Sequence, residues 1–272
     1  MFADDTNIFF TGRNPVELEN IVCKELCKFH DWFSANKLSL NIDKTNFMAF
    51  NSSDHAFDIR MNGKSVNRVE NTKFLGVYID SRLTWNLHIH HICKQISKGI
   101  GIMSKLKFTL PLKIKIKIDM SLVYPYLTYC STIWSGTTKS NLNRLEVLQK
   151  RAVRIIAMTN ARTRTSPIFA RLNLLKLNDI FTLNIATFTY RCRNSLLPSC
   201  FEDFYIINQS VHNYNTRHAT DIRTDHVRTS QYKRSLKYRS ASIWNNLPEN
   251  IKFCTTVASF RKCMTRHLKC HY

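Results

Sequence analysis

Two adjacent aspartates, Asp4 and Asp5, stand near the start of the chain between Phe2 and the apolar residues Ile8 to Phe10. Apolar residues on both sides of a polar centre are typical of a short β-hairpin, here with the carboxylates at its turn. Two carboxylates held together repel one another unless a cation neutralises them, which makes the pair a candidate Mg²⁺ site. A solvated turn without metal is the alternative, because neighbouring aspartates are common.

A second candidate group is basic and lies on a helix predicted from residue 140 to residue 158. One side of this helix is apolar, with Leu145, Leu148, Ala152 and Ile156, and the other side is basic, with Arg144, Lys150, Arg151 and Arg154. The basic side is suited to contact a phosphate backbone, and the absence of acidic residues from 150 to 171 favours this interpretation over a merely solvated face. Residues 212 to 240 form either a second nucleic-acid-binding stretch, with tyrosines interleaved among basic residues, or a flexible basic linker.

Two groups of cysteine and histidine residues have to be weighed as zinc sites. The first group falls within about one turn of a helix, where its side chains cannot surround a tetrahedral ion; it consists of His88, His90, His91 and Cys93. The spacing of the second group matches no zinc knuckle, although its last three members would share a helix face; it consists of Cys254, Cys263, His267 and Cys270. Neither spacing favours zinc.

The composition narrows the class of protein. The 272 residues carry a net charge of +21, from 40 basic and 19 acidic side chains, and 44% of them are apolar, as expected of a folded protein with an acidic partner. Glycine loops that bind nucleotides are excluded, because Gly99 and Gly101 lack every other element of such a motif. The longest uncharged stretch, residues 120 to 138, contains Pro125, Gly136 and seven Ser or Thr, so no membrane span is predicted.

The start of the chain lacks the basic and apolar regions of a signal peptide, and nine cysteines at irregular spacing indicate reduced thiols. We therefore expect an intracellular protein of the nucleus or cytoplasm that is not secreted. The charge is unevenly distributed, because residues 1 to 60 carry 6 basic and 9 acidic side chains whereas the rest of the chain carries 34 and 10. An acidic head thus precedes a basic body.

Periodicity predicts an α+β first part and a helical second part. The first part should contain a helix from Pro15 to about Asn36, strands at 44–51 and 57–61, a hairpin turn at Asn62-Gly63 and a strand at 74–79. Helices are predicted at 88–107, 111–124, 140–158, 178–194 and 256–268, with a loose connection over 198–240. The alternation from Lys113 to Ile118 would suit a strand, but Pro111 fits a helix start.

Four motifs together resemble those of reverse transcriptases. Phe2 to Asp5 resembles the metal-binding hairpin, and residues 36–45, 74–80 and 83–89 resemble in turn the next palm motif, the primer grip and the entry to the thumb. The sequences of these motifs are most similar to those of non-LTR, jockey-like (LINE-type) retrotransposons. The resemblance continues at 125–129, 148–152, 214–217 and 244–248. It spans nearly the whole chain.

The resemblance implies a role for several residues. Asp4 and Asp5 would help to bind the Mg²⁺ pair, Lys44 would protonate the leaving pyrophosphate, and the primer end would be held by Phe74, Leu75 and Gly76. The residues alone leave two alternatives open. Lys44 can be a surface lysine at a strand edge, and residues 74 to 76 can be an ordinary buried strand with a bulge.

The resemblance also implies three parts: a partial palm with the primer grip at 1–82, a mainly α-helical thumb at 83–195, and a basic C-terminal region at 196–272. The parent reaction would be RNA-templated DNA synthesis, with an RNA template and a DNA primer as partners. A palm needs a further aspartate and fingers residues before the Asp-Asp hairpin, so we expect a truncated polymerase with an incomplete Mg²⁺ site, inactive alone. The alternatives are a non-catalytic nucleic-acid-binding protein and a decayed product without a selected role. No oligomeric state is indicated.

Overall fold

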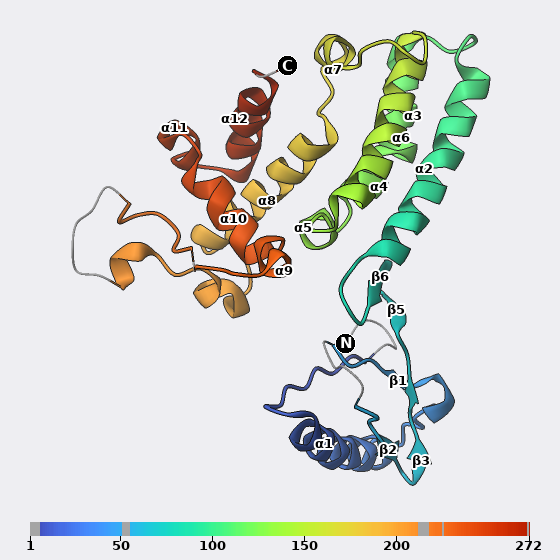
Figure 1. Ribbon diagram of the computed structural model, residues 1–272, viewed down its shortest axis with the longest axis vertical. Coiled ribbons are helices and arrows are strands. Elements are labelled where there is room, and N and C mark those ends of the chain that lie inside the picture. The colour runs from blue at the N-terminus through green and yellow to red at the C-terminus, as the bar shows by residue number, and fades with distance from the viewer. Residues whose placement is uncertain (1–5, 51–54, 212–217, 225, 271) are drawn as a thin grey trace. The chain divides into compact units, whose positions relative to one another are not determined.

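The computed structural model describes residues 6–50, 55–211, 218–224, 226–270 and 272. The chain forms two compact units, residues 1–85 and residues 86–272 (Figure 1). Each has its own apolar core. The finer division into palm, thumb and C-terminal region stays a prediction.

The first unit is built around helix α1, Pro15–Ala35. Asn14 caps this helix, because its side-chain oxygen accepts a hydrogen bond of 2.8 Å from the Glu17 amide, and Pro15 occupies the first turn where no amide is needed. The predicted helix is confirmed at both ends. Its buried residue Val22 packs in a small core with Ile59, Met61 and Val66.

The strands of the first unit are short. Among the described residues they form three separate two-stranded sheets: the parallel pair β1 (Asn46–Phe47) and β4 (Asn67–Arg68), the hairpin β2 (Arg60–Met61) and β3 (Lys64–Ser65), and the hairpin β5 (Asn71–Phe74) and β6 (Val77–Asp80). The turn predicted at Asn62-Gly63 is confirmed, with φ angles of 50° and 74°. Of the strand predicted over 44–51, the described residues form β1 alone, which follows a 3₁₀ turn at Ile42–Lys44; the strand predicted over 57–61 is reduced to β2.

The single strand predicted at 74–79 is wrong, because the chain reverses direction inside it. Leu75 and Gly76 have φ angles of 46° and 81° and form the two-residue turn that joins β5 to β6. Asn71 pairs with Asp80, and Phe74 pairs with Val77 across the turn. The hairpin could not be predicted from the sequence, because its first strand is polar and exposed and lacks the alternation of a half-buried strand.

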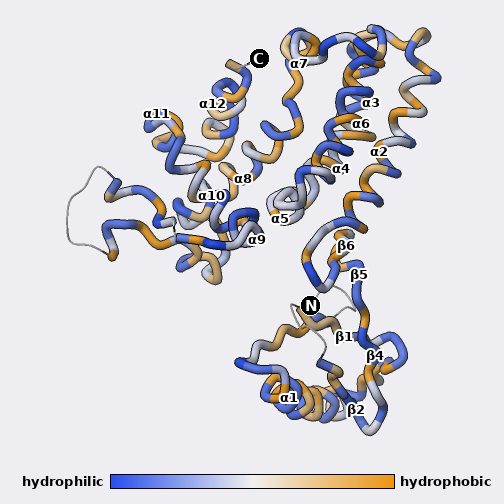
Figure 2. The backbone as a smooth tube through the Cα atoms, viewed as in Figure 1, coloured by the Kyte–Doolittle hydropathy of each residue, from blue (hydrophilic) through white to orange (hydrophobic). Residues whose placement is uncertain are grey.

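The second unit begins with a series of helices. These are α2 (Asn86–Leu106), α3 (Leu112–Leu122), α4 (Tyr124–Thr128), α5 (Ser131–Trp134), α6 (Lys139–Ala157), α7 (Ser166–Leu172) and α8 (Leu177–Arg193). Among them, α2, α6 and α8 are the longest. Helices α2, α3 and α6 pack together through buried side chains such as Ile96 and Leu145. The helices predicted at 88–107, 111–124, 140–158 and 178–194 are therefore confirmed, with the third of these periodic segments (α6) keeping its apolar side inward. Figure 2 shows polar and apolar residues mixed along each long helix, as expected when one side is buried.

The last part of the chain packs onto α8. It contains the 3₁₀ turns η2 (Ser199–Phe204) and η3 (Asn208–Ser210) and the helices α9 (Ser230–Lys233), α10 (Leu236–Asn245), α11 (Glu249–Lys252) and α12 (Val257–Lys269). Helices α10 and α12 both contact α8, and the Tyr190 and Phe260 rings stack with centroids 4.5 Å apart. The helix predicted at 256–268 is confirmed as α12.

The loose connection predicted over 198–240 is wrong for much of its described length. Ile207 and Ile222 form a β-bridge, and the Asn245 side chain holds the Ile222 backbone from both sides, with hydrogen bonds of 2.9 Å to its amide and 2.8 Å to its carbonyl. These contacts join residues far apart in sequence, so local periodicity does not reveal them. Within the described ranges, no helix is long and apolar enough to cross a membrane.

Candidate nucleic-acid interface

The residues expected to serve catalysis lie in the first unit. Asp4 and Asp5 fall outside the described residues, and residues 6 to 10, which follow them, form no strand. Lys44 ends the 3₁₀ turn Ile42–Lys44 and is exposed, so it does not lie on a strand edge. Phe74 is half-buried at the end of β5, whereas Leu75 and Gly76 are exposed at the hairpin tip. The three primer-grip candidates therefore stand together at an accessible turn, and not in a buried strand.

The cysteine and histidine groups do not converge in the structure. In the part of the chain that is described, no group of three or more His, Cys, Asp or Glu residues could hold a metal ion. His88 is buried in the core of the second unit, with its ring 5.6 Å from that of Trp134. Burial, together with the nearby His91, lowers the pKa of His88 to about 4, so its imidazole is neutral in the fold.

The four basic candidates of α6 divide into two pairs. Arg144 and Arg151 are exposed to solvent. Lys150 and Arg154 are half-buried and line a cleft, where Lys150 pairs with Glu146 at 2.5 Å and the Nε of Arg154 donates to the Thr163 carbonyl at 3.0 Å. The helix thus presents two differently placed pairs of cations.

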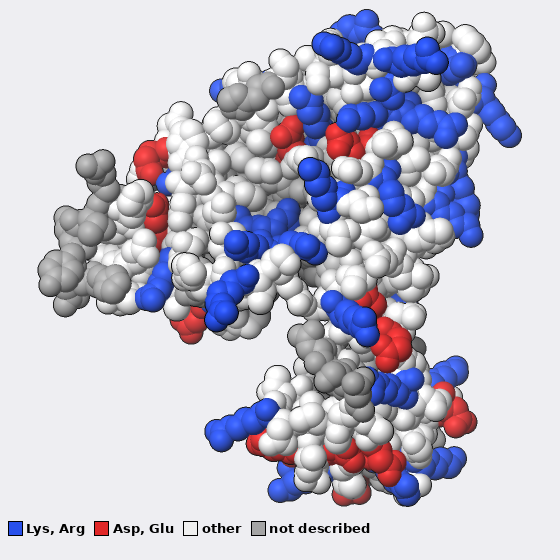
Figure 3. Space-filling model, viewed as in Figure 1, with Lys and Arg blue, Asp and Glu red and all other residues white. Residues whose placement is uncertain are grey.

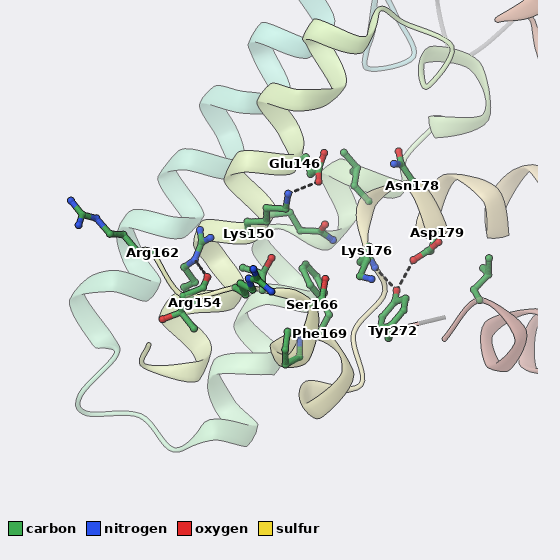
Figure 4. A pocket seen from close by; sticks show the side chains of 17 residues that line it. Glu146, Lys150, Arg154, Arg162, Ser166, Phe169, Lys176, Asn178, Asp179 and Tyr272 are labelled. Atoms are coloured by element: carbon green, nitrogen blue, oxygen red, sulfur yellow. Dashed lines mark hydrogen bonds and ion pairs between the residues drawn. The ribbon is translucent and has the colours of Figure 1, made fainter. Parts of the chain in front are cut away.

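This cleft, hereafter the basic cleft, has a volume of about 780 Å³ (Figure 4). Its walls come from α6, the loop that follows it, α7, the start of α8 and the last residues of the chain. Two acidic residues line it, Glu146 and Asp179, against five basic residues: Lys150, Arg154, Arg162, Arg164 and Lys176. The cleft is therefore positively charged.

One wall of the basic cleft is held by Tyr272. Its hydroxyl group accepts a hydrogen bond of 2.7 Å from the Lys176 amide and donates one of 2.7 Å to Oδ2 of Asp179. The Lys176 ammonium group lies 4.0 Å from the centre of the Tyr272 ring. Burial and the hydrogen bond to Asp179 raise the pKa of the Tyr272 hydroxyl, which therefore remains a neutral donor.

Both carboxylates of the basic cleft already have a partner in its lining. Glu146 is engaged by Lys150, and Asp179 accepts from Tyr272. Beside the cleft, Lys269 of α12 donates to the carbonyl and side-chain oxygens of Asn173, at 2.7 and 2.6 Å, which ties the end of α12 to the end of α7. The side chains that line the cleft therefore carry more basic than acidic groups, a charge that suits an anionic ligand.

The chain is similar in sequence to several curated proteins. No family model and no solved structure matches the chain. It is 26% identical over 182 residues to the RNA-directed DNA polymerase from mobile element jockey of Drosophila melanogaster, covering 65% of this chain and 20% of that protein. It is 26% identical over 198 residues to the probable RNA-directed DNA polymerase from transposon BS of the same species, covering 71% and 22%. The jockey polymerase of Drosophila funebris is 27% identical over 183 residues, covering 65% and 20%.

The chain is a relative of non-LTR retrotransposon reverse transcriptases. The family inferred from the motifs is thereby confirmed, over 57–71% of the chain and not over nearly all of it. The alignments cover about a fifth of the length of these curated relatives.

In this reverse transcriptase relative, the sequence revealed part of the basic cleft. Lys150 and Arg154 were identified from the helical pattern, and the acid-free run from 150 to 171 already contained Arg162 and Arg164. Lys176 and Tyr272 carried no such signal, because they meet only through the packing of α12 near the start of α8. Figure 3 shows that Lys and Arg side chains also crowd the part of the second unit that carries α2, α3 and α6.

Proposed function

We propose that the chain is part of an RNA-directed DNA polymerase and that its helical second unit binds the backbone of the RNA template and the DNA primer. The observation that carries this proposal is the combination of the basic cleft with the exposed Arg144 and Arg151 in a relative of reverse transcriptases. The second unit carries 30 basic and 8 acidic residues. Phosphate groups are the natural counterpart of such an excess.

In the first unit, the proposal assigns Phe74, Leu75 and Gly76 to the primer end. Its support is the exposed hairpin tip, where Leu75 and Gly76 present backbone without deep burial. The exposed position of Lys44 is compatible with contact to a substrate phosphate. The assignment of Asp4 and Asp5 to Mg²⁺ rests on the motif alone, because both lie outside the described residues.

The test is salt-dependent binding to nucleic acid. The full chain is titrated into fluorescein-labelled RNA–DNA hybrid, and the logarithm of affinity is plotted against the logarithm of salt concentration. Contact with about six phosphates should give a slope of roughly −4 to −5. Replacement of Arg144 and Arg151 by Gln should weaken binding to all sequences alike and reduce the slope by roughly 1 for each lost contact.

The matched control replaces Lys24 and Lys28 of α1 by Gln, which removes the same charge from the first unit. We expect this variant to bind as the unchanged chain does. Binding that is indifferent to salt, or equally weakened by the control, would contradict the proposed interface.

A further inference from the structure

The basic cleft differs from the exposed face of α6 in shape. A cavity of about 780 Å³ has the size of a site for a small ligand. A double helix presents its phosphates on a rigid convex surface, which can lie against exposed side chains such as Arg144 and Arg151 but cannot enter such a cavity. An unpaired nucleotide can enter, because its base and sugar are free to turn out of the strand.

The charges in the basic cleft suit a strand and not a neutral ligand. Arg162 and Arg164 are exposed at its rim, and Figure 4 shows Arg162 extending outward from the cleft. Arg154 uses its Nε for the Thr163 carbonyl, and among the described residues its two terminal nitrogens have no hydrogen-bond partner. Together with Lys176, these groups offer several phosphate contacts along one path.

The lining of the basic cleft is also partly apolar. Pro167 is exposed, and Leu268 and the Tyr272 ring are half-buried. Such groups cover the face of a sugar or base without reading its hydrogen-bonding edge, so contact of this kind tolerates any sequence. One wall is preorganised by the hydrogen bonds of Tyr272 to Lys176 and Asp179, which reduces the cost of ordering on binding.

We infer that the basic cleft binds unpaired nucleotides of a single strand, with their phosphates at the rim formed by Arg162 and Arg164, while duplex nucleic acid is held by the exposed face of α6. This inference rests on the proposed function and adds that unpaired and paired nucleic acid bind at two different surfaces of the second unit. The cleft receives the unpaired part of a template or primer, and Arg144 and Arg151 contact the paired part.

The experiment compares two probes on the full chain: fluorescein-labelled oligouridylate of about eight nucleotides, and a blunt duplex of similar contact length. The cleft variant is Arg162→Gln with Arg164→Gln, and its matched control is Arg144→Gln with Arg151→Gln, which removes the same charge from the same unit. All four residues are exposed, so both variants should fold, as circular dichroism will verify.

We expect the cleft variant to lose single-strand affinity and to reduce the single-strand salt slope by roughly 1.4 for two lost contacts, with duplex affinity little changed. The control should reduce the duplex slope by roughly 1.8 and leave single-strand binding nearly intact. Lys176→Gln, inside the cleft, should act like the cleft variant.

Three results would overturn the inference. If the cleft variant is silent toward the oligouridylate, or if both variants weaken both probes equally, single strands do not bind selectively in the basic cleft, although the proposed function stands. If the unchanged chain binds neither probe, the proposed function fails together with the inference.

Discussion

Asp119 is a buried carboxyl group that lowers the stability of the folded second unit when it is ionised. It is 7% exposed in α3, and among the described residues no cation or side-chain donor engages it. Burial raises its pKa from 3.8 to about 6. Because the folded pKa lies above the unfolded one, the folded state binds the proton more tightly, and stability falls as pH rises from about 4 through 6.

Replacing Asp119 by Asn should therefore stabilise the second unit at neutral pH. The shift in pKa corresponds to a penalty on the order of 3 kcal/mol when the carboxylate is ionised. The gain in unfolding free energy should be smaller at pH 5 than at pH 7.5, by about 1 kcal/mol, because part of the penalty is already relieved there. Chemical denaturation of both proteins at the two pH values measures the difference, and an equal gain at both would show that the ionisation of Asp119 is not the cause.

Asp4 and Asp5 allow chemistry to be separated from binding. Replacing both by Ala should leave affinity for nucleic acid unchanged or slightly higher, because two negative charges are removed and no phosphate contact is lost. Fluorescence anisotropy with an RNA–DNA hybrid in the absence of divalent metal is the measurement. A marked loss of affinity would mean that the aspartates support the binding surface itself.

At the scale of elements, helices were easier to foresee than strands. The periodicity of α2, α6 and α8 could be recognised in the sequence because each of these helices buries one side along its length. The β5–β6 hairpin was missed because only the apolar stretch that includes its turn and second strand stands out in the sequence. Only part of the basic cleft could be predicted from the sequence. The basic residues of α6 follow a helical pattern, whereas Tyr272 contacts Lys176 across 96 residues of sequence, which local periodicity does not reveal.

The junction between α5 and α9 provides a test of close packing in the second unit. A Cβ atom on Gly136 would overlap the carbonyl oxygen of Arg234, which is backbone and cannot swing away. Gly136→Ala should therefore destabilise the second unit, by about 1–3 kcal/mol, because the α9–α10 segment has to shift. Gly101→Ala is the control, since nothing lies within 4 Å of its added methyl group. Thermal unfolding of the two variants compares them, and equal melting temperatures would contradict the tight junction.

At the scale of the whole molecule, charge and core both favour the second unit as the binding part. It contains 30 of the 40 basic residues and an extended apolar core. We expect residues 86–272, produced alone, to fold cooperatively and to retain the full salt slope toward nucleic acid. Binding titrations of this segment beside the full chain provide the measurement, and a slope reduced by more than about 1 would show that the first unit supplies phosphate contacts.

The stacking of Tyr190 on Phe260 has a consequence for the chain while it is being synthesised. Tyr190 of α8 is synthesised 70 residues before Phe260, the ring that stacks on it. At about 5–20 residues per second, the apolar side of α8 waits roughly 4 to 14 seconds for α12 during synthesis. During that interval the nascent chain exposes the apolar surface of α8 that α12 covers, so we expect chains that end before α12 to keep this surface exposed.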